Sequence, residues 1–178
     1  MRRIFRRQGM VSNVPPMLQR ANELLAAMDF AGAAAAFARL AANAEQRNGP
    51  RAPFFYLQAG RANMLAGQKD TGYQQIKRGL SIIAQRGNFQ RLNKVTHRII
   101  NELKQHDMNK EADELATWLK AALPIGFTPA VAPQALKQAP LPTHCPSCGA
   151  PVRPDEVDWL DEATAECAFC GSPVRGEN

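Results

Sequence analysis

Four cysteines near the C-terminal end are the residues in this chain best suited to chemistry, and they lie in two CxxC pairs. The first pair is Cys145 and Cys148, the second is Cys167 and Cys170, and eighteen residues separate the pairs. This spacing is typical of a four-thiolate zinc site. Zinc imposes no geometry of its own and accepts a tetrahedron of four sulfurs. A glycine follows each pair, where a tight turn needs a residue that tolerates a positive φ angle.

Two disulfides, a redox CxxC and an iron site are the alternatives for these cysteines. The N-terminal apolar run is too short for a signal peptide, so we expect a cytoplasmic protein, whose thiols stay reduced. A redox CxxC comes as one pair beside a βαβ pattern. Iron in a rubredoxin-like site would use the same ligands, and the ligands alone do not separate it from zinc. Four protein ligands leave no position for a catalytic water, so the expected cofactor is one structural zinc. His144 is expected to be a solvated neighbour of the site.

At these cysteines the segment from about Pro142 to Gly176 resembles the zinc-ribbon superfamily. The resemblance implies two metal-binding turns joined by short β-strands, here around Pro151–Arg153 and Ala163–Cys167. The apolar content is too small to fold this segment alone. Zinc binding, on the order of 10–16 kcal/mol in comparable peptides, is therefore expected to supply most of its folding free energy. We call residues 143–178 the ribbon.

The 178-residue chain is long enough for one ordinary domain and a small module. Its 45% hydrophobic and 21% charged residues are typical of a soluble globular protein, and no stretch is long enough for a membrane span. The net charge of +6 is unevenly distributed. The ribbon has two arginines against seven acidic residues, which gives −5. Residues 1–14 form a basic arm with four arginines and no acid: Arg2, Arg3, Arg6 and Arg7.

Residues 15–123 have apolar side chains at helical spacing, which predicts a mainly α fold. Six helices in three hairpins are expected, near Pro16–Met28, Ala31–Gln46, Pro53–Ala66, Thr71–Arg86, Phe89–His106 and Asn109–Ala122. On the third helix, Phe55, Ala59 and Ala62 form the predicted buried face. Residues 124–142 contain five prolines and read as a semi-extended linker that keeps the ribbon at a distance from the helices.

Three turn signals suggest a repeat, because they begin at Met28, Gly67 and Asp107 and are almost equally spaced along the chain. Each is followed at the same short distance by a small residue: Ala33, Gly72 and Ala112. Ala21 and Gly60 are small positions in the first helices of two hairpins. This pattern resembles the tetratricopeptide repeat, in which small residues let paired helices approach closely. The period is longer than that of the usual tetratricopeptide repeat, so we describe the array as TPR-like, and a generic six-helix bundle remains the alternative.

A basic stretch lies in the predicted fourth and fifth helices. From Lys77 to Lys104 the chain has seven basic residues and one acidic residue, Glu102. Arg91, Lys94 and Arg98 are spaced to share one helix face. The face is either an ordinary solvated surface or a contact for an acidic protein or a nucleic acid. The candidate contact residues are the four N-terminal arginines together with Lys77, Arg78, Arg91, Lys94 and Arg98.

The chain has no P-loop, GxSxG or HExxH motif, so we expect no enzymatic activity. The predicted function is a protein–protein interaction adaptor with a structural zinc, which binds a protein or peptide, preferentially an acidic one. The alternative is a nucleic-acid-associated factor that contacts phosphates through the basic arm and basic stretch. The charge distribution also predicts that the acidic ribbon docks, at least transiently, on the basic face of the fourth and fifth helices.

Overall fold

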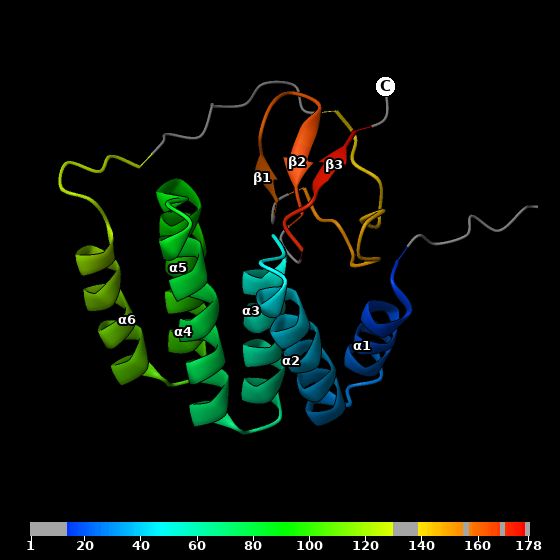
Figure 1. Ribbon diagram of the computed structural model, residues 1–178, viewed down its shortest axis with the longest axis horizontal. Helices are drawn as coiled ribbons and strands as arrows, with labels where there is room; N and C mark the ends of the chain where they lie inside the picture. Colours follow the sequence, from blue (N-terminus) through cyan, green and yellow to red (C-terminus); the bar gives the residue numbers. More distant parts are fainter. Residues whose placement is uncertain (1–13, 130–138, 155–156, 168–169, 177–178) are drawn as a thin grey trace, which may run out of the picture.

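The computed structural model describes residues 14–129, 139–154, 157–167 and 170–176. The protein is mainly α: six helices packed as hairpins are followed by a small β-sheet beside the four cysteines (Figure 1). The helices are α1 (Pro16–Ala26), α2 (Phe30–Gln46), α3 (Ala52–Leu65), α4 (Lys69–Gln85), α5 (Phe89–Gln105) and α6 (Asn109–Ala122). All six predicted helices are present, with ends close to those predicted. None of the described helices combines the length and apolarity needed to cross a bilayer.

A residue with a positive φ angle follows each of the first five helices. These residues are Met28, Asn48, Gly67, Gly87 and Asp107, and they recur at nearly equal intervals along the chain. The first, third and fifth of them begin the three turns predicted from the sequence. A left-handed residue ends a helix because the next N–H group can bond back to a carbonyl of the last turn. After α1, for example, the Asp29 N–H donates to the Leu24 carbonyl at 2.9 Å.

Helix α3 packs closely against α4 through two facing glycines. A Cβ atom on Gly60 would lie 2.7 Å from the Gly72 carbonyl oxygen, and one on Gly72 would lie 2.7 Å from the Gly60 carbonyl oxygen. Only glycine fits at either position without a shift of the helices. In the first and third hairpins the predicted small residues Ala33 and Ala112 are fully buried. The small residues identified from the sequence therefore lie at helix contacts.

Two hydrophobic clusters meet at α3. The first contains residues of α1, α2, the ribbon and one side of α3, including Phe55 and Ala59. The second contains the other side of α3, with Leu57 and Met64, together with α4, α5 and α6. The predicted single buried face of α3 was therefore too narrow. A helix with neighbours on both sides is buried nearly all round.

The described part of the ribbon contains a three-stranded antiparallel sheet with strand order β1 (Asp158–Trp159), β2 (Thr164–Glu166) and β3 (Pro173–Arg175). Strand β2 lies within the predicted strand. The strand predicted around Pro151–Arg153 is wrong, because only an isolated bridge between His144 and Pro151 forms there. Prolines at 151 and 154 lack the N–H groups that would extend the pairing.

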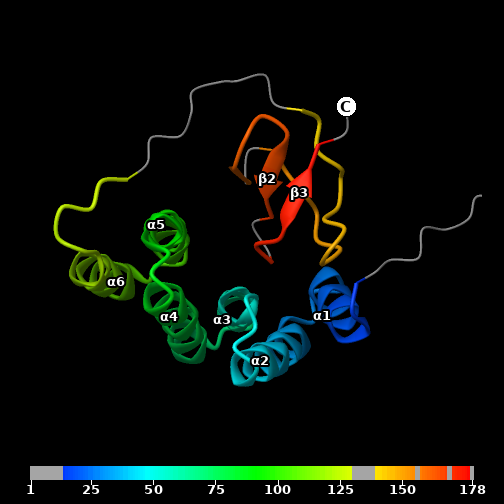
Figure 2. The same cartoon turned by 45° about the horizontal axis from the view of Figure 1, so that its top comes forward.

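The helices form an arc, and the sheet lies on its inner side (Figure 2). Helices α1, α3 and α5 are nearer to the sheet than α2, α4 and α6. The ribbon and the helices α1 to α3 share the first hydrophobic cluster, so the prediction that the linker keeps the ribbon at a distance is wrong. The linker is long enough to let the ribbon fold back, and packing against the helices then decides its position.

Candidate metal centre

The four cysteine sulfurs lie within 4.8 Å of one another, and all four residues are buried. The Sγ atoms of Cys145 and Cys170 are 3.8 Å apart, as are those of Cys148 and Cys167. A disulfide bond is about 2.05 Å long, so these are free thiols. A tetrahedron with metal–sulfur distances of about 2.3 Å has edges of about 3.8 Å. The cluster therefore has the dimensions of a four-thiolate metal site.

Two turns that share the same backbone hydrogen bonds hold the sulfurs in place. In each CxxCG turn the glycine N–H donates to the carbonyl of the first cysteine, at 2.8 Å for Gly149 to Cys145 and for Gly171 to Cys167. The φ angles of the two glycines are +72° and +68°, as the sequence predicts. The first cysteine of each turn also donates its N–H to the residue after the glycine, Ala150 or Ser172. Backbone hydrogen bonds thus aim both pairs of sulfurs at one point.

Crowding of the four thiols moves their pKa values apart. Hydrogen bonding with Cys148 lowers the pKa of Cys145 to about 7, whereas hydrogen bonding with Cys145 raises the pKa of Cys148. Hydrogen bonding with Cys145 also raises the pKa of Cys167 and lowers that of Cys170. Four thiolates at this separation repel one another unless a cation lies between them. The donor set therefore fits a divalent metal, whose binding releases the protons that remain.

His144 lies beside the cluster and not in it. Its side chain is exposed, and its Nδ1 atom is 3.1 Å from the Thr143 hydroxyl oxygen. Its position is that of the solvated neighbour expected from the sequence. An open cleft of about 590 Å³ lies between the first CxxCG turn and α1, with His144, Asn22 and Glu23 among its lining residues.

Three side chains of the helices lie at the contact with the part of the ribbon that holds the four cysteines. At the first turn, Asn22 of α1 donates through Nδ2 to the Cys148 carbonyl at 2.6 Å. Near the second turn, Arg91 of α5 forms an ion pair with Glu166 of β2. The Arg91 guanidinium also stacks on the ring of Phe54 in α3, with 4.0 Å between Cζ and the ring centroid. Each of α1, α3 and α5 thus contributes one side chain to the surface on which the ribbon lies. We call these three side chains, Asn22, Phe54 and Arg91, the seat of the ribbon.

Sequence reasoning missed Asn22, Phe54 and Glu166 as functional residues. Each has an ordinary surface or core identity in the sequence, and no local pattern signals a contact with a segment so distant along the chain. The predicted docking of the ribbon is found at Arg91. The hydrophobic cluster that contains ribbon residues, however, includes residues of α1, α2 and α3 rather than of α4 and α5.

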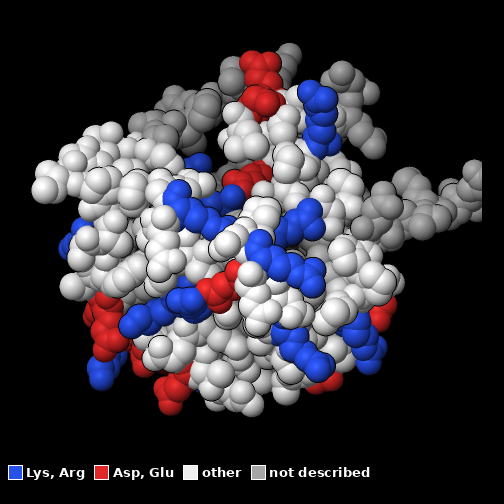
Figure 3. Space-filling view, in the orientation of Figure 1, with Lys and Arg blue, Asp and Glu red and all other residues white. Residues whose placement is uncertain are grey.

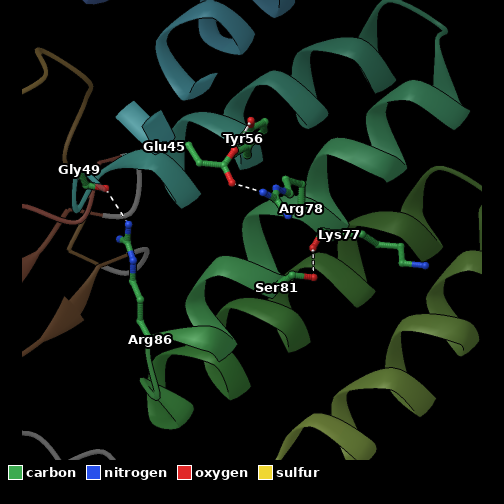
Figure 4. A network of polar contacts seen from close by, with 7 residues as sticks. All are labelled: Glu45, Gly49, Tyr56, Lys77, Arg78, Ser81 and Arg86. Atoms are coloured by element: carbon green, nitrogen blue, oxygen red, sulfur yellow. Dashed lines mark hydrogen bonds and ion pairs between the residues drawn. The ribbon is translucent and has the colours of Figure 1, made fainter. Parts of the chain in front are cut away.

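A separate polar network joins α2, α3 and α4 (Figure 4). Glu45 accepts a hydrogen bond from the Tyr56 hydroxyl at 2.7 Å and forms an ion pair with Arg78. The hydrogen bond from Tyr56 and the charge of Arg78 lower the pKa of Glu45. Arg86 donates to the carbonyls of Gly49 and Pro50 at 2.9 and 3.0 Å. These contacts tie the ends of α2 and α4 together.

Those candidate contact residues that the structure describes do not form one free basic surface. Arg78 and Arg91 are paired with carboxylates of different elements, Glu45 of α2 and Glu166 of β2. The Lys77 ammonium lies 5.5 Å from the ring centroid of Tyr73. Lys94 is exposed and Arg98 partly buried on α5. Figure 3 shows basic side chains gathered near the middle of the face drawn, with acidic ones among them. Arg2, Arg3, Arg6 and Arg7 lie outside the described residues.

Fold and site together define a helical-hairpin protein with a small C-terminal sheet, beside which two turns bring four buried cysteines into one cluster, as a zinc site requires. No family model matches the chain, and neither the curated proteins nor the solved structures contain a significant match to it.

Proposed function

We propose that the protein is a non-enzymatic protein–protein interaction adaptor whose C-terminal segment is a zinc ribbon. The 3.8 Å separations between sulfurs support a tetrahedral ion, and zinc is the metal that most often takes four thiolates in such turns. With four protein ligands the ion would have no open position, and its role would be to hold the ribbon together. Reduced thiols of this kind suit a cytoplasmic protein.

The helical part is proposed to be a TPR-like array. Its support is the spacing of the left-handed residues Met28, Gly67 and Asp107 together with the small residues buried at the helix contacts. In such arrays one helix of each hairpin lines the concave side, which is the side that binds partners. Here α1, α3 and α5 are the helices nearest to the ribbon.

The single observation that carries the adaptor proposal is the seat of the ribbon. Asn22 of α1 and Arg91 of α5 contact one folded polypeptide segment through a hydrogen bond and an ion pair, and the ring of Phe54 in α3 supports Arg91. A surface that holds a segment of its own chain in this way has the chemistry to hold a segment of another protein. The alternative, binding of nucleic acid, is less favoured because it needs an extended basic surface, whereas acidic side chains lie among the basic ones on the face drawn in Figure 3.

The test is capture of partners from extract of the cells that make the protein. The full chain is immobilised with its metal, and the extract is divided into a nuclease-treated half and an untreated half. An adaptor retains the same proteins from both halves. Retention of nucleic acid alone, with an affinity that falls steeply as salt rises, would replace the adaptor proposal by the alternative.

A further inference from the structure

The seat of the ribbon contains an arginine prepared to bind a carboxylate. Phe54 is only 6% exposed, and its ring supports the Arg91 guanidinium at 4.0 Å. The ion pair of Arg91 with Glu166 leaves the two side chains 18% and 16% exposed. Charges this well covered are costly unless they are paired. The stacked ring fixes the plane of the guanidinium, so its N–H groups are already oriented when a carboxylate arrives.

The second CxxCG turn shows what else an occupant of this site needs. A Cβ atom on Gly171 would lie 2.6 Å from Arg91 Nη2 and 2.6 Å from two carbon atoms of the Phe54 ring. The backbone at Gly171 therefore rests directly on the stacked pair, and a residue with a side chain would displace it. The occupant is a segment that presents a carboxylate together with a glycine whose backbone lies against Phe54.

We propose that Phe54 and Arg91 form a carboxylate-binding site for an acidic, glycine-containing segment of a partner protein, and that the ribbon is its competitor within the chain. This inference rests on the proposed adaptor function and names the chemistry of the partner. The charge of α5 agrees with it, because Lys94 and Arg98 follow Arg91 at helical spacing on the same element. Because the ribbon is tethered to the helices, its effective concentration at the site reaches about millimolar. A partner segment must therefore bind tightly, or bind when the ribbon has already dissociated from the site.

The experiment titrates the full-length, metal-loaded chain with a fluorescein-labelled decapeptide of alternating glutamate and glycine. The variant Glu166→Gln removes the charge of the competitor and keeps its shape. We expect it to bind the peptide at least tenfold more tightly than the wild type. Glu162→Gln is the matched control, since it makes the same change at an exposed side chain of the ribbon. A peptide of alternating glutamine and glycine should not bind to any of these chains.

Arg91→Lys in the Glu166→Gln background keeps the charge but removes the planar group that stacks on Phe54. It should abolish the tenfold gain, while elemental analysis and circular dichroism show the same metal content and helicity. The proposal is overturned if Glu166→Gln binds no more tightly than Glu162→Gln, or if the gain survives Arg91→Lys. A partner protein that is captured equally well by the Arg91→Lys chain would refute this site and leave the adaptor function standing. Capture of no protein by the wild type would refute the adaptor function itself.

Discussion

Removal of the metal should loosen α1 and α2 but leave α6 unchanged. The ribbon belongs to the same hydrophobic cluster as α1, α2 and one side of α3, whereas α6 belongs to the other cluster. A chelator that strips the ion would unfold the CxxCG turns, because so small a segment has little else to stabilise it. The helices that pack against the ribbon then lose part of their burial.

The size of the effect on α1 follows from its contacts. The hydrogen bond from Asn22 to the Cys148 carbonyl contributes about 1 kcal/mol, and the burial of Val14 in the hydrophobic cluster that it shares with the ribbon adds a small apolar term. A loss of about 1–2 kcal/mol changes the ratio of closed to open states by a factor of about 5–30. Amide hydrogen exchange in α1 should therefore accelerate about 5- to 30-fold.

Hydrogen–deuterium exchange read by mass spectrometry is the assay, with and without chelator. Asn22→Ala in the metal-loaded protein should reproduce part of the acceleration in α1. Gln19→Ala, an exposed position on the same helix, should not. Unchanged exchange in α1 after metal loss would refute the seat described here, and equal acceleration in α1 and α6 would show that the two clusters form one cooperative unit.

Three substitutions test the helical array. Gly60→Ala should destabilise the protein by about 1–3 kcal/mol in denaturant unfolding, because its Cβ would lie 2.7 Å from the Gly72 carbonyl oxygen. Thr96→Val should stabilise it by about 1 kcal/mol, since the Thr96 hydroxyl is fully buried and has no hydrogen-bond partner among the described residues. Tyr73→Phe should remove a loss of stability at high pH. Burial and the charge of Glu114 raise the pKa of Tyr73 to about 12. The unfolded phenol loses its proton near pH 10, so the stability of the wild type is unaffected by Tyr73 ionisation below pH 10 and falls by up to about 3 kcal/mol toward pH 12.

Each of these substitutions has an outcome that would contradict the structure. Alanine replacing glycine within a helix normally gains about 1 kcal/mol, so a more stable Gly60→Ala chain would mean that α3 and α4 are farther apart. Thr117→Val is the control for Thr96, because the exposed Thr117 hydroxyl donates to the Asp113 carbonyl. An equal change in stability for Thr96→Val and Thr117→Val would show that the Thr96 hydroxyl is not both buried and without a hydrogen-bond partner. Identical pH profiles from 10 to 12 for wild type and Tyr73→Phe would place the phenol in solvent.

The helices were predictable because their signals are local. Apolar spacing within one helix and turn residues such as Met28, Gly67 and Asp107 depend on near neighbours in the sequence. The cysteine cluster was predictable for the same reason, since each CxxCG turn determines its own backbone geometry. The failures involve distant partners. The charge distribution predicted that the acidic ribbon docks on the helix face that contains Arg91, but it did not predict Glu166 as the partner, because nothing in the sequence separates Glu166 from the other acidic residues of the ribbon.

The helices against which the ribbon packs could not be predicted from the linker. Its composition indicates how stiff the linker is, but not the direction in which it leads the chain. The nearly complete burial of α3 was missed because Leu57 and Met64 lie opposite the stripe of Phe55 and Ala59, and a second stripe becomes visible only when a second neighbour is present. The strand predicted beside Pro151 failed because proline removes a ladder hydrogen bond, a local reason that the sequence did contain.

The metal content of the purified full-length chain tests the central claim most directly. Elemental analysis should find one zinc per chain in the wild type and a large loss in Cys148→Ser, whose hydroxyl is a poor substitute for the thiolate. Ser147→Ala, within the same turn but outside the sulfur cluster, should keep the full content. Absence of zinc from the wild type, or full zinc in Cys148→Ser, would contradict the account.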